Sequence, residues 1–167
     1  MYSIISGSQK LNSEEVLKKY HYKCFKCGKD LHNVNSEQER PLDHPLPIYY
    51  LYPLTTETAT LLCRNCNGKK RAKWPSAFYS EDKVRELSIR TGISYELLSG
   101  EPLYNSDALE YLKKSENVDQ LLKQYAKYMN VIIKLRNRIL KDCGFDFFKY
   151  SQTISQDWIE KADKEYE

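Results

Sequence analysis

Two pairs of cysteines are the most chemically distinctive residues of the sequence. Cys24 pairs with Cys27, and Cys63 pairs with Cys66, each with two residues between its members. This spacing lets one tight turn present two sulfur atoms to one ion, and Zn²⁺ prefers four tetrahedral thiolates. Because such a shell has no open position, we expect a structural zinc that joins the two segments. Cys143 is expected to be a free thiol, and neither His21 nor His32 is needed as a ligand.

A second group of polar residues lies inside and just after the segment that the cysteines enclose. Asp43 and His44 stand together inside this loop, and Asn67 directly follows the last cysteine of the two pairs. An imidazole titrates near neutral pH and can therefore accept a proton from water. Carboxylate and amide oxygens suit a hard cation such as Mg²⁺. Phosphodiester hydrolysis needs both functions, a nucleophile and neutralisation of charge at phosphorus.

The order of these residues resembles the HNH motif of the ββα-metal nucleases. The resemblance covers residues 20–74, with paired cysteines, Asp-His, an apolar strand that ends in Leu-Leu-Cys, and then Cys-Asn-x-x-Lys. It implies a zinc-stapled ββα-metal core. It also implies a one-metal mechanism in which His44 is the general base, while Asp43 and Asn67 bind the catalytic Mg²⁺ or Mn²⁺.

One position departs from the pattern of that family. The family usually has an Asn five residues before the third cysteine, which braces the catalytic hairpin, and here the position is Thr58. A threonine hydroxyl has a shorter reach and one donor in place of two. Three alternatives follow: Thr58 substitutes for the Asn, Thr56 or Glu57 orients His44, or the activity is weak.

Helix and strand signals predict the elements that position these groups. Asn12, with Glu15 three residues later, predicts a helix over residues 13–20. Residues 58–62 are β-branched and apolar and predict a strand, and a helix is expected over residues 66–73. The fold class is α+β, with a zinc-bound HNH core and its N-terminal helix over residues 1–76.

The second half of the chain reads as mainly helical. A helix is expected over residues 81–90, ended by Gly92, and residues from Ser106 onward are expected to be helical. Apolar residues at helical spacing predict a core-facing stripe of Tyr128, Ile132, Leu135 and Ile139. We therefore expect a helical region over residues 77–167 that binds DNA or forms a dimer. A helix-turn-helix over residues 87–94 is a minor alternative to two packed helices.

Basic residues gather next to Asn67. Between residues 64 and 73 there are five basic residues and no acidic one, although the net charge of the chain is only +3. Such a block can neutralise phosphates, and a solvated helix face is the alternative. The candidates for DNA contact are Lys69, Lys70, Arg71 and Lys73. Tyr49, Tyr50 and Tyr52 either contact bases or pack in the core.

These patterns predict a metal-dependent DNA endonuclease. A chain of 167 residues with no fused helicase-like module most resembles type II restriction endonucleases, which act on double-stranded palindromic DNA as homodimers. The alternatives are a non-specific or structure-selective nuclease of the toxin, phage or repair kind, and a non-catalytic zinc module that binds nucleic acid. No apolar run approaches the ~20 residues of a membrane helix, and no secretory signal is visible, so we expect a cytoplasmic protein without a membrane partner.

Overall fold

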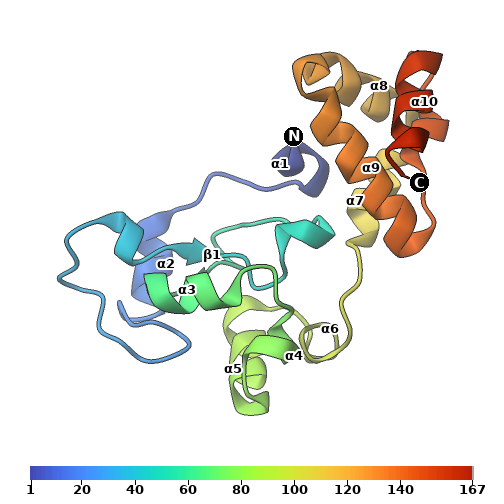
Figure 1. Ribbon diagram of the computed structural model, residues 1–167. Coiled ribbons are helices and arrows are strands. Elements are labelled where there is room, and N and C mark those ends of the chain that lie inside the picture. Colours follow the sequence, from blue (N-terminus) through green and yellow to red (C-terminus); the bar gives the residue numbers. More distant parts are fainter. Residues whose placement is uncertain (167) are drawn as a thin grey trace. The chain divides into compact units, whose positions relative to one another are not determined.

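The computed structural model describes residues 1–166 and consists of short helices and one two-stranded sheet (Figure 1). The chain divides into two compact units. One comprises residues 2–105, and the other comprises the chain from Ser106 onward together with Met1. The fold is α+β, with a helical C-terminal part, as the sequence predicts.

The first unit carries the sheet. Its helices are α1 (Tyr2–Ser6), α2 (Ser13–Lys19), α3 (Arg64–Lys70), α4 (Pro75–Phe78), α5 (Glu81–Thr91) and α6 (Tyr95–Ser99), with 3₁₀ turns η1 (Glu37–Glu39) and η2 (Ile48–Tyr50). The strands are β1 (Leu42–Asp43) and β2 (Thr60–Leu61). They pair antiparallel, with Leu42 opposite Leu61 and Asp43 opposite Thr60.

Side-chain caps fix the beginnings of the two helices that flank this sheet in sequence. At α2, the side chain of Asn12 accepts a hydrogen bond from the main-chain N–H of Glu15 at 3.2 Å, as its sequence predicts. At α3, the cap is Cys63, whose Sγ accepts from the main-chain N–H of Cys66 at 3.4 Å. Helix α3 therefore begins at Arg64, two residues before its predicted start, and ends at Lys70.

A single hydrophobic core extends through the first unit and moves the expected domain boundary. Helices α4, α5 and α6 contribute to the same core as the cysteine segments, through Trp74, Tyr79, Val84, Leu87 and Leu98. The compact unit therefore extends beyond residue 76, where we expected the boundary, because these apolar side chains would be exposed if the unit ended there. The division falls after Asn105.

Polar contacts reinforce this arrangement of the first unit. The Lys26 ammonium donates to the main-chain oxygen of Phe78 at 2.6 Å, and the Trp74 indole N–H donates to the main-chain oxygen of Leu97 at 3.1 Å. Helix α6 has only five residues and is held by the second of these bonds. Two packed helices, rather than a helix-turn-helix with a recognition helix, describe this segment.

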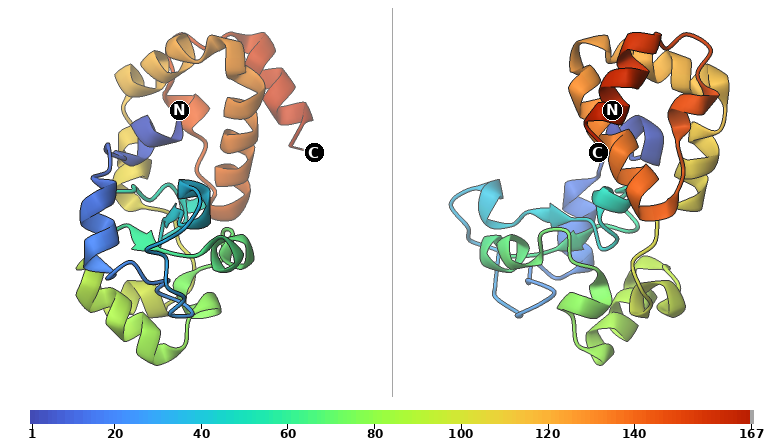
Figure 2. Two further views of the ribbon diagram at one scale, coloured as in Figure 1. Left: turned by 90° about the vertical axis from the view of Figure 1, so that its left-hand side faces the viewer. Right: turned by 45° about the vertical axis from the view of Figure 1, so that its right-hand side comes forward.

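The second unit is made of helices (Figure 2). They are α7 (Ser106–Leu112), α8 (Ser115–Gln124), α9 (Met129–Cys143) and α10 (Gln156–Lys164), with 3₁₀ turns η3 (Ala126–Tyr128) and η4 (Phe147–Tyr150). On α9, Ile132, Leu135 and Ile139 are buried as predicted, but Tyr128 is 60% exposed. Tyr128 lies in the 3₁₀ turn before the helix, and Met129 is buried at the start of α9 in its place.

A buried arginine ties the helices of the second unit together. Nε of Arg136 donates to Oδ1 of Asp146 at 2.9 Å, and its Nη2 lies 2.8 Å from Oδ1 of Asp163 on α10. A buried charge is tolerated when it is paired and hydrogen-bonded in this way. Across the described residues, none of the helices has the length and apolar character needed to cross a membrane.

Candidate functional site

Four cysteine side chains of the first unit converge on one point. The Sγ atoms of Cys24, Cys27, Cys63 and Cys66 all lie within 4.8 Å of one another. Cys27 Sγ and Cys63 Sγ are 3.9 Å apart, whereas a disulfide would need about 2.05 Å. A tetrahedral shell with Zn–S bonds of about 2.3 Å has sulfur–sulfur edges of about 3.8 Å. The predicted cluster is confirmed, and its dimensions fit a zinc ion.

The first pair of these cysteines lies on a tight knuckle next to the sheet. The main-chain N–H of Gly28 donates to the oxygen of Cys24 at 2.8 Å, and Gly28 has a φ of 72°, which glycine adopts without strain. The main-chain N–H of Phe25 donates to the oxygen of Leu61 at 2.9 Å. This bond fixes the knuckle beside β2, so that the first pair meets the second pair where β2 leads into α3.

Burial governs the protonation of the clustered thiols. Cys24, Cys63 and Cys66 are buried, and Cys27 is exposed. Burial raises the pKa of the Cys24 and Cys66 thiols, because a charged thiolate is poorly solvated inside the protein. A bound divalent cation would deprotonate these thiols, so metal uptake is expected to release protons.

His32, one of the two histidines near the first cysteine pair, contacts other residues. The ring of His32 stacks on Tyr22 with centroids 4.4 Å apart, and its Nδ1 lies 2.9 Å from Oδ1 of Asp30. Among the described residues, the cluster of possible metal ligands contains only the four cysteines.

Asp43 ends β1 and faces the opposite strand. The hydroxyl of Thr60 on β2 donates to the main-chain oxygen of Asp43 at 3.3 Å and lies 3.5 Å from its Oδ2. Burial raises the pKa of the Asp43 carboxyl, and the nearby Lys70 and Thr60 offset part of that rise. The carboxylate is thus a largely enclosed oxygen donor that is held by the hairpin.

Lys70 is the main difference between the predicted site and the structure. Its side chain is 1% exposed, and its Nζ lies 3.0 Å from Oδ2 of Asp43 and donates to the main-chain oxygen of His44 at 2.6 Å. Lys70 is therefore not part of a DNA-contacting surface in this conformation. The reason is helical spacing, because Lys70 follows Cys66 by four residues and shares its inward face. Only Lys69, Arg71 and Lys73 of the four candidates are exposed.

His44 follows Asp43 directly and is partly exposed. Burial lowers the pKa of its imidazole to about 4, and the charge of Lys70 contributes in the same direction. The ring is therefore neutral at pH 7, the state in which it can accept a proton. Within the described part of the chain, no other side chain hydrogen-bonds to this imidazole.

The residues considered as braces for His44 are used for other contacts. Thr58 closes a turn with Thr55, with the two hydroxyl oxygens 3.1 Å apart. The main-chain oxygens of Thr56 and Glu57 accept from the Lys19 ammonium at 3.2 and 2.7 Å. The hydroxyl that touches the Asp-His segment belongs to Thr60. Sequence analysis missed Thr60, although its place two residues after Thr58 puts it on the same face of the strand.

Asn67 lies in α3, and its side chain is partly exposed. It precedes Lys70 by three residues, so the two side chains share one face of the helix. The structure therefore brings Asp43, His44 and Lys70 into direct contact and places Asn67 on the helix face that carries Lys70.

The loop tyrosines serve mainly as packing residues. Tyr50 and Tyr52 lie edge-on to Trp74, with ring centroids 5.4 and 5.8 Å away. Tyr49 is partly exposed and contacts Tyr50 at 4.8 Å. Stacking on bases is thus not supported for Tyr50 and Tyr52, whose rings belong to the core of the unit.

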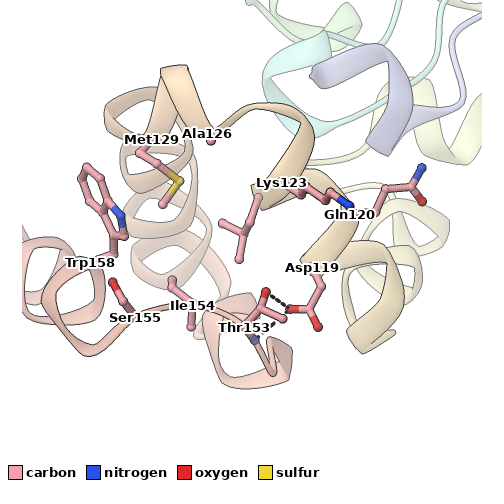
Figure 3. A pocket seen from close by; sticks show the side chains of 10 residues that line it. Asp119, Gln120, Lys123, Ala126, Met129, Thr153, Ile154, Ser155 and Trp158 are labelled. Carbon is pink, nitrogen blue, oxygen red and sulfur yellow. Dashed lines mark hydrogen bonds between the residues drawn. The ribbon is translucent and has the colours of Figure 1, made fainter.

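The second unit contains a separate hollow of about 620 Å³ (Figure 3). Met129 and Trp158 are among its apolar lining residues, and Asp119 lies at its edge. The Asp119 carboxylate accepts hydrogen bonds from the hydroxyls of Ser151 and Thr153. This acidic group therefore holds a loop in place.

Comparisons of the chain with protein families, with curated proteins and with solved structures gave no match. The functional interpretation therefore depends on the residues of the site alone.

Proposed function

We propose that the first unit is a metal-dependent nuclease core of the HNH type, which hydrolyses phosphodiester bonds in DNA around a structural zinc. The observation that carries this proposal is the joining of the Asp43-His44 segment to α3. Lys70 on α3 makes this connection, and Thr60 on β2 holds the same segment to the neighbouring strand. Helix α3 also carries Cys66 of the four-cysteine cluster. Two short strands followed by a helix, with Asp43 at the end of the first strand, His44 directly after it and Asn67 on the helix, match the order of the ββα-metal motif.

His44 is assigned as the general base. Its imidazole is neutral at pH 7 because burial lowers its pKa to about 4, and it is partly exposed, so water can reach it. A neutral imidazole accepts the proton of an attacking water molecule as the oxygen–phosphorus bond forms. The low pKa makes His44 a weaker base than an ordinary histidine. We therefore expect the correct orientation of the attacking water to contribute more to the rate enhancement than the basicity of the imidazole does.

Asp43 and Asn67 are assigned as ligands of a catalytic Mg²⁺ or Mn²⁺. Their carboxylate and amide oxygens are the donor types that such a hard cation prefers. When bound, this ion would neutralise charge on the phosphate and stabilise the leaving oxygen. The Lys70 ammonium already lies 3.0 Å from Oδ2 of Asp43, so the metal ion must compete with it for this carboxylate.

The DNA-contacting surface is assigned to the C-terminal end of α3. Lys69, Arg71 and Lys73 are exposed there. Their ammonium and guanidinium groups are available for phosphates, and such contacts supply affinity without sequence preference. Arg71 directly follows the helix with a φ of 49°, so the chain turns at this point, between the exposed Lys69 and Lys73.

More specifically, we propose that the protein cleaves DNA at particular sequences as a homodimer, as type II restriction endonucleases do. The test is digestion of plasmid DNA by the zinc-loaded protein with added Mg²⁺. Discrete fragments would support a restriction-like enzyme, and a smear would indicate a non-specific or structure-selective nuclease. Absence of any cutting with Mg²⁺ or Mn²⁺ would refute the nuclease assignment.

A non-catalytic zinc module that binds nucleic acid is the second candidate. The ammonium of Lys70 on Asp43 favours it, because a carboxylate that is already paired has less need of a metal ion. Binding of double-stranded DNA without cleavage under the same conditions would favour this alternative.

A further inference from the structure

Lys70 supplies the positive charge that the enclosed carboxylate of Asp43 requires. Its ammonium is enclosed, with the side chain 1% exposed, and contacts one carboxylate oxygen and one carbonyl oxygen. The carboxylate of Asp43 is 10% exposed. It also accepts from the main-chain N–H of His44 and lies 3.5 Å from the Thr60 hydroxyl, but neither of these groups carries a charge. An enclosed carboxylate of this kind is stable when a cation neutralises it.

We propose that Lys70 is an internal counter-ion that holds the place of the divalent cation, so that a cation can bind Asp43 only when the Lys70 ammonium leaves. This inference rests on the proposed function, in which Asp43 is a ligand of the catalytic ion. It adds a regulatory role for Lys70 at the same site, because the Asp43–Lys70 pair has no net charge, whereas a divalent cation added beside the ammonium would leave a strong excess of positive charge.

Repulsion between the two cations is the physical basis of the exclusion. Mg²⁺ binds carboxylate oxygens at about 2.0–2.1 Å, and the ammonium lies 3.0 Å from the same carboxylate. Because the pair is shielded from water, the repulsion between a divalent ion and an ammonium there is poorly screened. Both cannot share Asp43 without a large loss of affinity.

The position of Lys70 in α3 allows its side chain to leave. Lys70 is the last residue of the helix. A change of its side-chain rotamers breaks the contacts with Asp43 and His44 but leaves the main chain of the helix unchanged. The flexible four-carbon stem carries a compact, strongly hydrated charge. The neighbouring residues Lys69 and Arg71 are exposed, which indicates that solvent lies within reach at this end of α3.

The experiment observes the Lys70 ammonium in the zinc-loaded wild-type protein by ¹⁵N NMR. An enclosed ammonium in an ion pair exchanges its protons slowly and gives a visible Nζ–H signal, whereas exposed lysines do not. The signal is assigned by its loss in Lys70→Arg. Asp43→Asn is the control in which the ammonium has lost its partner. Titration with MgCl₂ is compared with NaCl at the same ionic strength.

Loss of the Lys70 signal with MgCl₂ but not with NaCl is the expected result. Persistence of the signal throughout the MgCl₂ titration would overturn the inference, whether the ion fails to bind or binds the other oxygen of Asp43 beside the intact pair. This readout needs no DNA. Cleavage with a persistent Lys70 signal would refute the inference alone, and displacement without cleavage would refute the nuclease function alone.

The Mn²⁺ affinities of the wild type and of two lysine variants, measured by electron paramagnetic resonance, show how strongly Lys70 competes with the cation for Asp43. Lys70→Met is expected to bind Mn²⁺ about tenfold more tightly than the wild type, because it removes the competing charge. Lys69→Met removes the same charge from the exposed neighbouring position and is expected to change the affinity less than about twofold, because that charge is screened. Equal effects of both substitutions would contradict competition at Asp43. If Lys70→Met does not fold, the wild-type titration still decides.

Discussion

Thr60 on β2 lies directly opposite Asp43 on β1, and its hydroxyl donates to the main-chain oxygen of Asp43 at 3.3 Å. The hairpin that carries the Asp-His segment is therefore braced by Thr60 and not by Thr58, which bonds to Thr55. Thr60 lies two residues after Thr58 and still holds the end of β1, but its hydroxyl contacts Asp43 and not the His44 ring.

Thr60→Val is expected to destabilise the protein and to weaken cleavage more than Thr58→Val. The hydroxyl of Thr60 is fully buried, and loss of a buried hydrogen bond costs about 1 kcal/mol, or up to about 3 kcal/mol if an acceptor is left unpaired. Urea denaturation of both variants, with zinc content measured in parallel, provides the comparison. A larger effect of Thr58→Val would place the brace at Thr58 after all.

Removing one partner of the Lys70–Asp43 pair is expected to cost more than removing both. Lys70→Met leaves a buried carboxylate without its counter-ion, and such changes cost about 3–5 kcal/mol. The double variant with Lys70→Met and Asp43→Asn removes both charges and is expected to recover most of this loss. Unfolding free energies of the wild type, both single variants and the double variant form a double-mutant cycle. A double variant as unstable as the sum of the single variants would mean that the two groups do not interact.

The four-cysteine cluster is expected to hold one zinc ion that stabilises the first unit. Cys63→Ser removes a ligand that also caps α3, so loss of zinc and unfolding of residues 2–105 should follow, because a structural zinc contributes folding energy directly. Elemental analysis and limited proteolysis measure the two effects. Cys143→Ser is the matched control, since Cys143 lies on α9 outside the cluster. A fully folded Cys63→Ser protein without zinc would refute the structural role.

The titration of His44 should differ from that of an ordinary histidine. Burial lowers its pKa from the usual 6.5 to about 4, so the folded protein leaves His44 neutral where the unfolded chain binds a proton. Stability from this group is therefore present above pH 6.5 and falls as the pH decreases from 6.5 toward 4. NMR of the imidazole in the zinc-loaded protein measures the midpoint directly. A midpoint near 6.5 would show that the ring is in contact with solvent.

The local features of the site follow from the sequence, because they depend on short spacings. Two residues between paired cysteines lead to one knuckle, and Asn12 caps its helix through a contact three residues away. Three prolines between residues 41 and 47 exclude a helix around the Asp-His pair, and Asp43 ends a short strand there.

The features that sequence analysis missed depend on packing between distant segments. Lys70 lies in a strongly basic run and was therefore expected at the surface, yet its spacing from Cys66 turns it inward, where Asp43 supplies the compensating charge. Helix α3 begins earlier than expected because Cys63 acts as a cap. The unit extends to Asn105 because Trp74 and Leu98 join the same core as Val16, Phe25 and Leu61, which come from much earlier in the sequence.

Cleavage of supercoiled plasmid DNA by His44→Ala tests the central claim most directly. The variant is compared with the wild type and with His32→Ala, in which the histidine stacked on Tyr22 is removed, all zinc-loaded and with Mg²⁺. The account predicts that His44→Ala binds DNA as the wild type does but cuts it about 10²–10⁴ times more slowly, while His32→Ala retains its activity. Cutting by His44→Ala at the wild-type rate, or no cutting by the wild type with either Mg²⁺ or Mn²⁺, would contradict the account.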